Sequence, residues 1–125
     1  MNYQPKYFRI SEYSCKCGCG LIHLNPNVLY FFDRMRELYG KPMIVTSGCR
    51  CEEHNRKVGG SPGSSHTPQE DGYTYAMDIE CHDSNERFEL IKAAVRVGCK
   101  RMGIAKEYIH FDFSTTHPQD VIWVY

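Results

Sequence analysis

The sequence predicts an α+β fold in which a small antiparallel sheet carries helices on one face. Two segments, one after Pro26 and one after Asp83, repeat apolar residues every three or four positions, as amphipathic helices do. Several short segments alternate apolar and polar residues, which is typical of half-buried strands. A chain of 125 residues suffices for one core. Residues 1–125 are therefore expected to form a single domain.

Composition limits the classes of function. The chain is 42% hydrophobic and 24% charged, with a formal net charge of zero. This balance argues against a nucleic-acid binder that depends on excess positive charge. No apolar run approaches the roughly 18 residues of a membrane span, and the first residues lack an apolar signal region. We expect a monomer that is made in the cytosol and does not insert into membranes.

The N-terminal part contains an unusual run of cysteines. A single helical turn is expected at residues 10–13, with Ser11 as its cap. It is followed by a C-x-C-x-C run at Cys15, Cys17 and Cys19. This spacing differs from the C-x-x-C of zinc knuckles and favours a glycine-rich turn with partly buried thiols, with an auxiliary metal site as the alternative. The seven cysteines of the chain are expected to be reduced.

The first long helix is predicted to begin at Pro26 and to end at Gly40. Asn25 can cap it, and proline fits the first helical position, where a missing N–H costs nothing. A glycine just past the last turn is typical of a helix end. The predicted core stripe consists of Val28, Phe31 or Phe32, Met35 and Leu38, and the predicted solvent face consists of Asp33, Arg34, Arg36 and Glu37.

A buried strand at residues 42–46 leads into the turn Ser47-Gly48-Cys49-Arg50, a location where binding groups usually lie. Arg50 could hold a carboxylate with its planar fork of donors, or it could be an ordinary surface arginine. Residues 51–63 are predicted to form a short polar helix and a flexible loop, in which His54 has a structural or capping role.

The second half of the chain contains four predicted strands and one helix. Residues 73–80 alternate as a strand whose polar face carries Asp78. Asp83 and Glu86 have the spacing of a capping box, which predicts a helix at about residues 84–97. Its core stripe would be Phe88, Ile91 and either Ala94 or Val95. The remaining strands are predicted at residues 100–105, 108–113 and 120–125, with a tight turn at Lys106-Glu107 and with the last strand at an edge.

Candidate metal ligands lie on the polar faces of two predicted strands. His110 and Asp112 share one face of their strand, about 7 Å apart along the chain. Asp78 lies on the polar face of the other strand, and His66 precedes that strand. Two histidines and one carboxylate suit zinc with an open coordination position. We expect His66, Asp78 and His110 to hold one catalytic Zn²⁺ ion.

Several motifs follow one another in a specific order. They are Ser47-Gly48-Cys49-Arg50, then His54-Asn55…Val58-Gly59-Gly60, then Ser64-Ser65-His66…Gly72-Tyr73-Thr74-Tyr75-Ala76-Met77-Asp78, then Glu107-Tyr108-Ile109-His110. Ser11-Glu12-Tyr13…Cys17-Gly18-Cys19-Gly20 and the terminal Trp123-Val124-Tyr125 frame them. In this order the sequence resembles the M15 zinc peptidases, the D-Ala-D-Ala carboxypeptidase and dipeptidase group, and in particular their short forms from bacteriophages and bacterial cell-wall enzymes.

The resemblance implies a Hedgehog/DD-peptidase-like fold and a peptidoglycan stem peptide as substrate. It implies that His66, Asp78 and His110 bind Zn²⁺, which activates a water molecule. Glu107 would be the general base toward that water and would pass the proton to the leaving amine. Arg50 would hold the terminal carboxylate of the substrate or stabilise charge on the carbonyl oxygen. The enzyme would act on the cell wall, in phage release or in wall remodelling.

Strand parity constrains the proposed base. Glu107 is three residues before His110, so a regular strand would place the two on opposite faces. Glu107 must therefore lie at the bend where the strand begins. Otherwise Asp112 is the alternative base, although orienting a zinc-bound histidine suits it better. The residues expected to line the cleft are Ser64, Tyr73, Tyr75 and Tyr108.

Two departures from the family pattern concern substrate choice. Residues 67–71 lengthen the gap between the metal histidine and the aspartate, which we interpret as a loop insertion at the rim of the site. Cys49 replaces the aromatic residue expected before Arg50. The sequence does not identify the peptide bond that is cut, because a carboxypeptidase, a dipeptidase and an endopeptidase could share these residues. The competing hypotheses are a catalytically silent zinc-containing wall-binding module and a cysteine-based redox or metal-storage protein.

Overall fold

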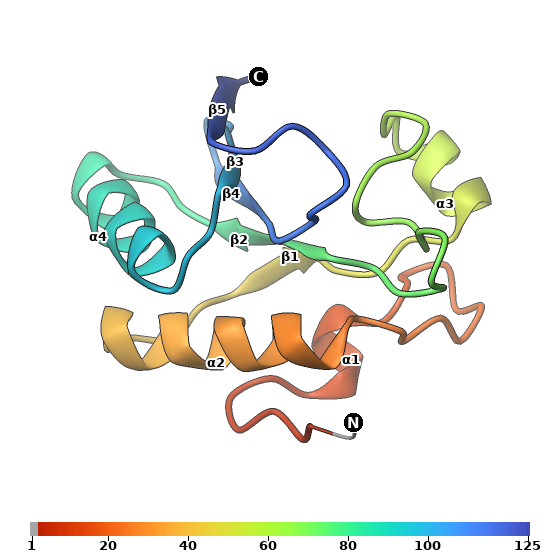
Figure 1. Cartoon of the computed structure of the whole chain (residues 1–125), viewed down its shortest axis with the longest axis horizontal. Helices are drawn as coiled ribbons and strands as arrows, with labels where there is room; N and C mark the ends of the chain where they lie inside the picture. Colours follow the sequence, from red (N-terminus) through yellow and green to blue (C-terminus); the bar gives the residue numbers. More distant parts are fainter. Residues whose placement is uncertain (1–2) are drawn as a thin grey trace.

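The computed structural model of the chain describes residues 3–125 and contains, within them, four helices and five strands. The helices are α1 (Ile10–Tyr13), α2 (Pro26–Tyr39), α3 (Glu52–Lys57) and α4 (Ser84–Arg96), and the strands are β1 (Val45–Ser47), β2 (Ala76–Glu80), β3 (Arg101–Ile104), β4 (Tyr108–Asp112) and β5 (Val121–Val124). In the view of Figure 1, α2 runs below the strands, α4 lies to their left, and α3 lies to the upper right. The predicted α+β class is confirmed.

The sheet is mixed rather than antiparallel. Its strand order is β1-β2-β4-β3-β5, and the first three pairings are antiparallel. β5, however, pairs with β3 in parallel. The expectation of an antiparallel sheet is therefore wrong at this edge, because residues 113–120 carry the chain past β3 instead of forming a hairpin with β4. The prediction that the last strand lies at an edge is confirmed.

α2 has the boundaries that its sequence predicts. The side-chain oxygen of Asn25 accepts hydrogen bonds from the backbone N–H groups of Asn27, at 2.9 Å, and Val28, at 3.4 Å. Pro26 is the first helical residue, and Gly40 ends the helix in the left-handed conformation, with φ of 78°. The side chains that α2 buries are Val28, Leu29, Phe32, Asp33 and Met35. Leu38, predicted in the core stripe, is 41% exposed.

Three further predictions about the helices are wrong. Asp33 is buried rather than solvated, because the N-terminal segment folds over it and the backbone N–H groups of Lys6 and Tyr7 donate to its carboxylate. Phe88 is 63% exposed, since α4 turns Leu90, Ala93 and Ala94 inward instead. Ser11 does not cap α1, because the helix already begins at Ile10.

The register of β2 and β4 separates an apolar face from a polar one. Met77 lies opposite Phe111, and Ile79 lies opposite Ile109; all four side chains belong to the core. The alternate positions place Asp78 directly opposite His110 and Ala76 opposite Asp112. β2 is shorter than predicted and begins at Ala76, because Thr74 forms an isolated bridge with Leu24 instead. The polar face is the one that the sequence predicts for metal ligands.

Gly48 allows β1 to lie against α1. A Cβ atom at this position would lie 2.5 Å from the carbonyl oxygen and 2.6 Å from the Cα atom of Tyr13. The backbone N–H of Cys49 also donates to the Tyr13 oxygen, at 2.8 Å. Because these are backbone atoms that cannot rotate away, no side chain fits here.

We expect Gly48→Ala to lower the free energy of unfolding by about 2–3 kcal/mol, the upper range for overpacking. Urea unfolding of the variant and of the unmodified protein measures the difference. Gly40→Ala is the control: its Cβ meets no atom within 4 Å, so only the left-handed backbone strain of about 1 kcal/mol opposes it. Equal destabilisation by the two substitutions would contradict the close approach at Gly48.

Within residues 3–125, no helix has the length and apolar character needed to cross a membrane.

Candidate metal centre

Three buried side chains meet on the polar face of the sheet: His66, from the loop before β2, Asp78 in β2 and His110 in β4. The Nε2 atom of His66 lies 3.0 Å from Oδ1 of Asp78, and Nδ1 of His110 lies 2.9 Å from the same oxygen. The two ring nitrogens are 3.1 Å apart. The structure thus brings together the three ligands that the sequence predicts.

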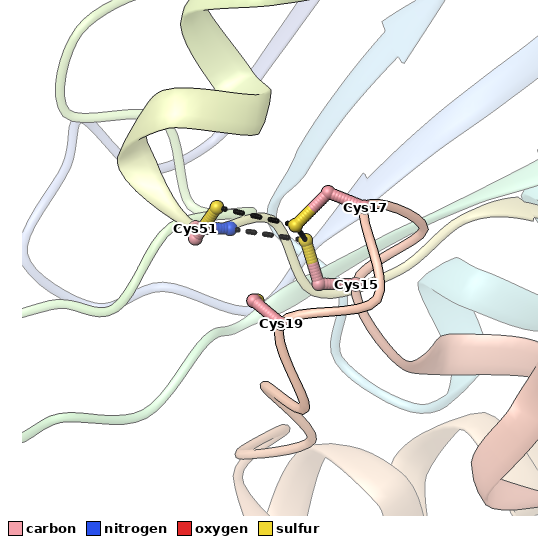
Figure 2. A group of neighbouring side chains, drawn as sticks. All are labelled: Cys15, Cys17, Cys19 and Cys51. Carbon is pink, nitrogen blue, oxygen red and sulfur yellow. Dashed lines mark hydrogen bonds between the residues drawn. The ribbon is translucent and has the colours of Figure 1, made fainter.

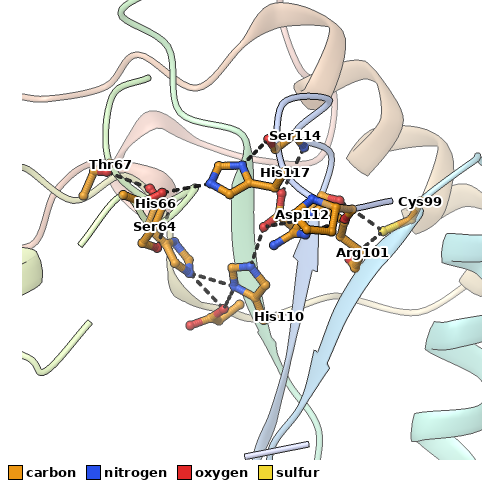
Figure 3. Close-up of polar contacts among 12 residues, drawn as sticks. Ser64, His66, Thr67, Cys99, Arg101, His110, Asp112, Ser114 and His117 are labelled. Atoms are coloured by element: carbon orange, nitrogen blue, oxygen red, sulfur yellow. Dashed lines mark hydrogen bonds and ion pairs between the residues drawn. The ribbon is translucent and has the colours of Figure 1, made fainter. Parts of the chain in front are cut away.

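Each histidine is held through its other ring nitrogen. Nδ1 of His66 lies 2.7 Å from the carbonyl oxygen of Gly48, which can only accept, so this nitrogen carries the proton. Nε2 of His110 lies 3.0 Å from a carboxylate oxygen of Asp112 and donates to it (Figure 3). In these tautomers both remaining nitrogens turn a lone pair toward Asp78. Three acceptors so close together need a proton or a cation between them.

The three donor atoms fit a metal ion. Bonds of about 2.0–2.1 Å at tetrahedral angles place ligand atoms about 3.3 Å apart. The measured separations among the three atoms are 2.9, 3.0 and 3.1 Å, which need only a small expansion. The carbonyl of Gly48 and the carboxylate of Asp112 orient the two rings as such a site requires. The group could therefore hold a metal ion and leave one position open.

The electrostatics of the metal-free group centre on His110. Burial lowers the pKa of His110, but hydrogen bonds with Asp112 and Asp78 outweigh burial and raise it to about 9. Burial dominates at His66 and lowers its pKa. Burial raises the pKa of both carboxyls, yet bonds from the histidines outweigh it: the pKa of Asp112 falls to about 2, and that of Asp78 falls well below its usual range. One proton on His110 thus occupies the place of a cation.

A cavity of about 420 Å³ opens over this group. One wall is the loop of residues 58–65, and another carries the aromatic side chains of Tyr108, Trp123 and Tyr125. Arg50 also lines the cavity. The candidate ligands therefore lie at the bottom of a space large enough for part of a peptide.

Arg50 is anchored in the cavity and is not a surface arginine, since its side chain is only 15% exposed. Its Nε donates to the Ser47 hydroxyl at 3.0 Å, and its Nη1 donates to the Asn55 side chain at 3.0 Å. Nη2 lies 3.5 Å from Oδ2 of Asp78. A guanidinium has five N–H groups, so two are left for a ligand in the cavity.

Comparison with protein families agrees with this geometry. A family model described as Peptidase M15 matches residues 5–112, which include all three members of the buried group. The chain belongs to the M15 peptidases. This is a family of metal-dependent peptidases, so the buried histidines and aspartate have a function that fits their donor set. No curated protein matches the chain.

In this M15 peptidase Asp112 lies behind His110 and fixes its ring. Besides the ring N–H of His110, it accepts the backbone N–H of Ser114 at 2.9 Å and lies 3.3 Å from Nε of Arg101. The residue is 1% exposed, and both of its carboxylate oxygens already have protein partners. This arrangement suits an orienting group rather than the alternative base considered from the sequence.

Glu107 lies outside the cavity. It occupies the bend before β4, as the sequence required, but its side chain is exposed and the residue is not part of the cavity lining. Its backbone oxygen accepts the N–H of Cys81 at 2.9 Å. Because Tyr108, His110 and Asp112 alternate onto the cavity side, Glu107 falls on the other side of the strand. The structure does not bring the expected base to the metal centre.

Of the other expected lining residues, Ser64 and Tyr108 line the cavity, whereas Tyr73 and Tyr75 do not. The hydroxyl of Tyr75 bonds to Asp71 instead. The loop position of Tyr73 and Tyr75, before β2 begins, explains why their predicted strand alternation fails.

Sequence reasoning missed His117, which lies in the loop of residues 113–120 and lines the cavity. Its Nδ1 is 2.6 Å from the Ser114 hydroxyl, and its Nε2 is 3.1 Å from the carbonyl oxygen of Gly63 (Figure 3). The sequence held no motif around it. Trp123 was quoted only as part of the terminal motif, yet its ring lies 5.6 Å from that of His110.

The two departures from the family pattern lie away from the cavity. Gln69, Glu70 and Asp71 line a separate pocket together with Thr115 and Thr116. The expectation that residues 67–71 form the rim of the site is wrong, because none of them lines the cavity. Cys49 is 1% exposed, and its sulfur lies 3.2 Å from the Thr74 hydroxyl. It belongs to the core and not to the cavity wall.

Proposed function

We propose that this M15 peptidase is a zinc enzyme that hydrolyses the stem peptides of peptidoglycan. The observation that carries the proposal is the group of three acceptor atoms about 3 Å apart at the bottom of a cavity. Zn²⁺ would be held by Nε2 of His66, Oδ1 of Asp78 and Nδ1 of His110. When bound, the ion supplies an activated water and polarises the scissile carbonyl.

The position of Arg50 favours a substrate that has a carboxylate near the bond that is cut. Its remaining N–H groups can bind a carboxylate in the bidentate geometry that arginine prefers. Its contacts with Ser47 and Asn55 hold the guanidinium in place before the substrate arrives. A stem peptide offers the terminal D-alanine carboxylate to a carboxypeptidase. In an endopeptidase, the same guanidinium would stabilise charge on the carbonyl oxygen.

His117 is the side chain that we assign to proton transfer, and Glu107 is the competing assignment. His117 is the histidine in the cavity lining that is not one of the three proposed ligands. Histidine is the side chain that most often serves as a general acid or base. Its bonds with the Ser114 hydroxyl and the Gly63 carbonyl hold the ring at the cavity wall, and one of them must open when the ring exchanges a proton.

We expect His117→Ala to lower kcat about 10²–10⁴-fold, the usual contribution of general acid–base catalysis. Glu107→Gln should keep kcat within about threefold of the unmodified enzyme, because its side chain lies outside the cavity. Both variants should retain bound zinc, which elemental analysis checks. The reverse result, with Glu107→Gln inactive and His117→Ala active, would show that Glu107 is the general base and that His117 is not.

Digestion of purified muropeptides, followed by mass spectrometry, tests the proposed function. We expect a chelator-sensitive loss of D-alanine, or of a larger fragment, that added Zn²⁺ restores. The mass lost identifies the bond. A catalytically silent wall-binding module remains the second candidate, because the expected base lies outside the cavity. Intact muropeptides after incubation with zinc-loaded protein, together with sedimentation of the protein on purified cell walls, would support that module instead.

A further inference from the structure

The C-x-C-x-C run folds into a cluster with a fourth cysteine that is distant in sequence. The Sγ atoms of Cys15, Cys17, Cys19 and Cys51 all lie within 4.8 Å of one another. Those of Cys15 and Cys17 are 3.4 Å apart, and those of Cys17 and Cys51 are 3.7 Å apart. Figure 2 shows the loop after α1 meeting the turn before α3 at this point.

Two of the sulfur separations, 3.4 and 3.7 Å, are close to those around one tetrahedral zinc ion. Zinc–sulfur bonds of about 2.3 Å at tetrahedral angles place neighbouring sulfurs about 3.8 Å apart. A disulfide needs about 2.05 Å, and all seven cysteines are free. Four converging sulfurs with this geometry are typical of a structural zinc site, and such sites leave no position open for water.

The backbone of the loop is shaped to bring the thiols together. Alternate residues of a strand are about 7 Å apart, too far for one ion. Gly18 and Gly20, with φ of 82° and 89°, adopt the left-handed conformation and fold the loop back on itself. The glycine-rich turn that the sequence predicts is thus present. This turn also makes the alternative, an auxiliary metal site, possible, because it brings the three cysteines together.

Two backbone N–H groups support thiolates in the cluster. The N–H of Cys51 points to the sulfur of Cys15 at 3.4 Å, and the N–H of His54 points to the sulfur of Cys51 at 3.3 Å. Bonds of this kind orient metal-binding thiolates and offset their charge. Cys15 is buried and Cys51 half-buried, whereas Cys17 and Cys19 are exposed, so an ion can enter from solvent.

We propose that Cys15, Cys17, Cys19 and Cys51 form a second, structural Zn²⁺ site, which ties residues 15–19 to the start of α3. Each thiol that binds the ion releases its proton to solvent, so four protons leave and no electrons are transferred. The loop has few apolar side chains of its own to bury, since residues 16–20 are all exposed. The ion would supply the cross-link that this segment otherwise lacks.

Zinc content of the reduced protein, measured by elemental analysis, tests the proposal. The unmodified chain should bind two zinc ions. The double variant His66→Ala/His110→Ala should bind one, and so should Cys17→Ser/Cys19→Ser. Because these two cysteines are exposed, their replacement leaves no cavity, and circular dichroism checks that the variant is folded. Cys81→Ala, which removes a thiol outside the cluster, should still bind two.

Cobalt provides a readout that needs no cysteine substitution. In the His66→Ala/His110→Ala variant, bound Co²⁺ should show the strong sulfur-to-metal charge-transfer absorption of a thiolate site. The absence of this absorption together with zinc-free protein would overturn the proposal. So would a disulfide between any two of the four cysteines in protein kept under reducing conditions. Both readouts are independent of peptidase activity, so failure of the proposed enzymatic function leaves this test intact.

Discussion

His66→Ala is expected to remove the metal from the buried centre and to lower kcat/KM by about 10³-fold or more. The ion contributes several kcal/mol to transition-state stabilisation, and each 1.36 kcal/mol is tenfold in rate. Two of the three proposed ligands, Asp78 and His110, would remain, without the nitrogen that completes the set. Metal content and the rate of muropeptide cleavage, measured on the same sample, check both parts.

His82→Ala is the matched control for this prediction. His82 is exposed, with 56% of its side chain accessible, and its ring Nε2 lies 3.5 Å from a carboxylate oxygen of Glu80. Its removal should change neither metal content nor rate. If His66→Ala kept its full complement of zinc and its activity, the centre formed by His66, Asp78 and His110 would have to be abandoned.

Asp112→Asn is expected to weaken metal binding about 10–100-fold, the usual effect of removing a carboxylate that orients a ligating histidine. The amide keeps the size of the side chain but can no longer act as an anionic acceptor for Nε2 of His110. It also leaves the nearby Arg101 without its carboxylate partner. Competition with a chromophoric chelator measures the affinity. Activity should return at high zinc concentration, because the ligands themselves are intact.

The acid stability of the metal-free protein provides a second readout for Asp112. The folded pKa of about 2 is below the unfolded value, so this group stabilises the fold above about pH 4, and that contribution is lost as the pH falls toward 2. Asp112→Asn should remove this part of the acid dependence. Asp120→Asn, at an exposed loop position, is the control, and an equal change in both variants would count against the orienting role of Asp112.

The ligand set was predictable from sequence because it depends on local rules. Alternation along β2 and β4 places Asp78 and His110 on a polar face, and the two strands are neighbours in the sheet. The boundaries of α2 follow from Asn25, Pro26 and Gly40, each of which has a strong preference for one helix position.

The features that the sequence did not predict depend on contacts between distant segments. Cys51 joins the cysteine cluster only because the turn after β1 lies beside the N-terminal loop, 34 residues away along the chain. Asp33 is buried because residues 3–7 cover it. The parallel pairing of β5 depends on the path of residues 113–120, which have no periodic pattern. The alternation of side chains along a regular strand did predict that Glu107 and His110 lie on opposite faces.

The turn between β1 and α3 limits how the enzyme can be re-engineered. Within four residues it supplies the carbonyl of Gly48 that orients His66, the guanidinium of Arg50 and the thiol of Cys51. A graft here would disturb all three at once. The loop of residues 58–63 forms a cavity wall without holding a proposed ligand. Its three glycines are constrained, since a Cβ at Gly60 would meet the Asn55 side chain and Gly59 and Gly63 have positive φ. The positions to alter for substrate range are therefore Val58, Ser61 and Pro62.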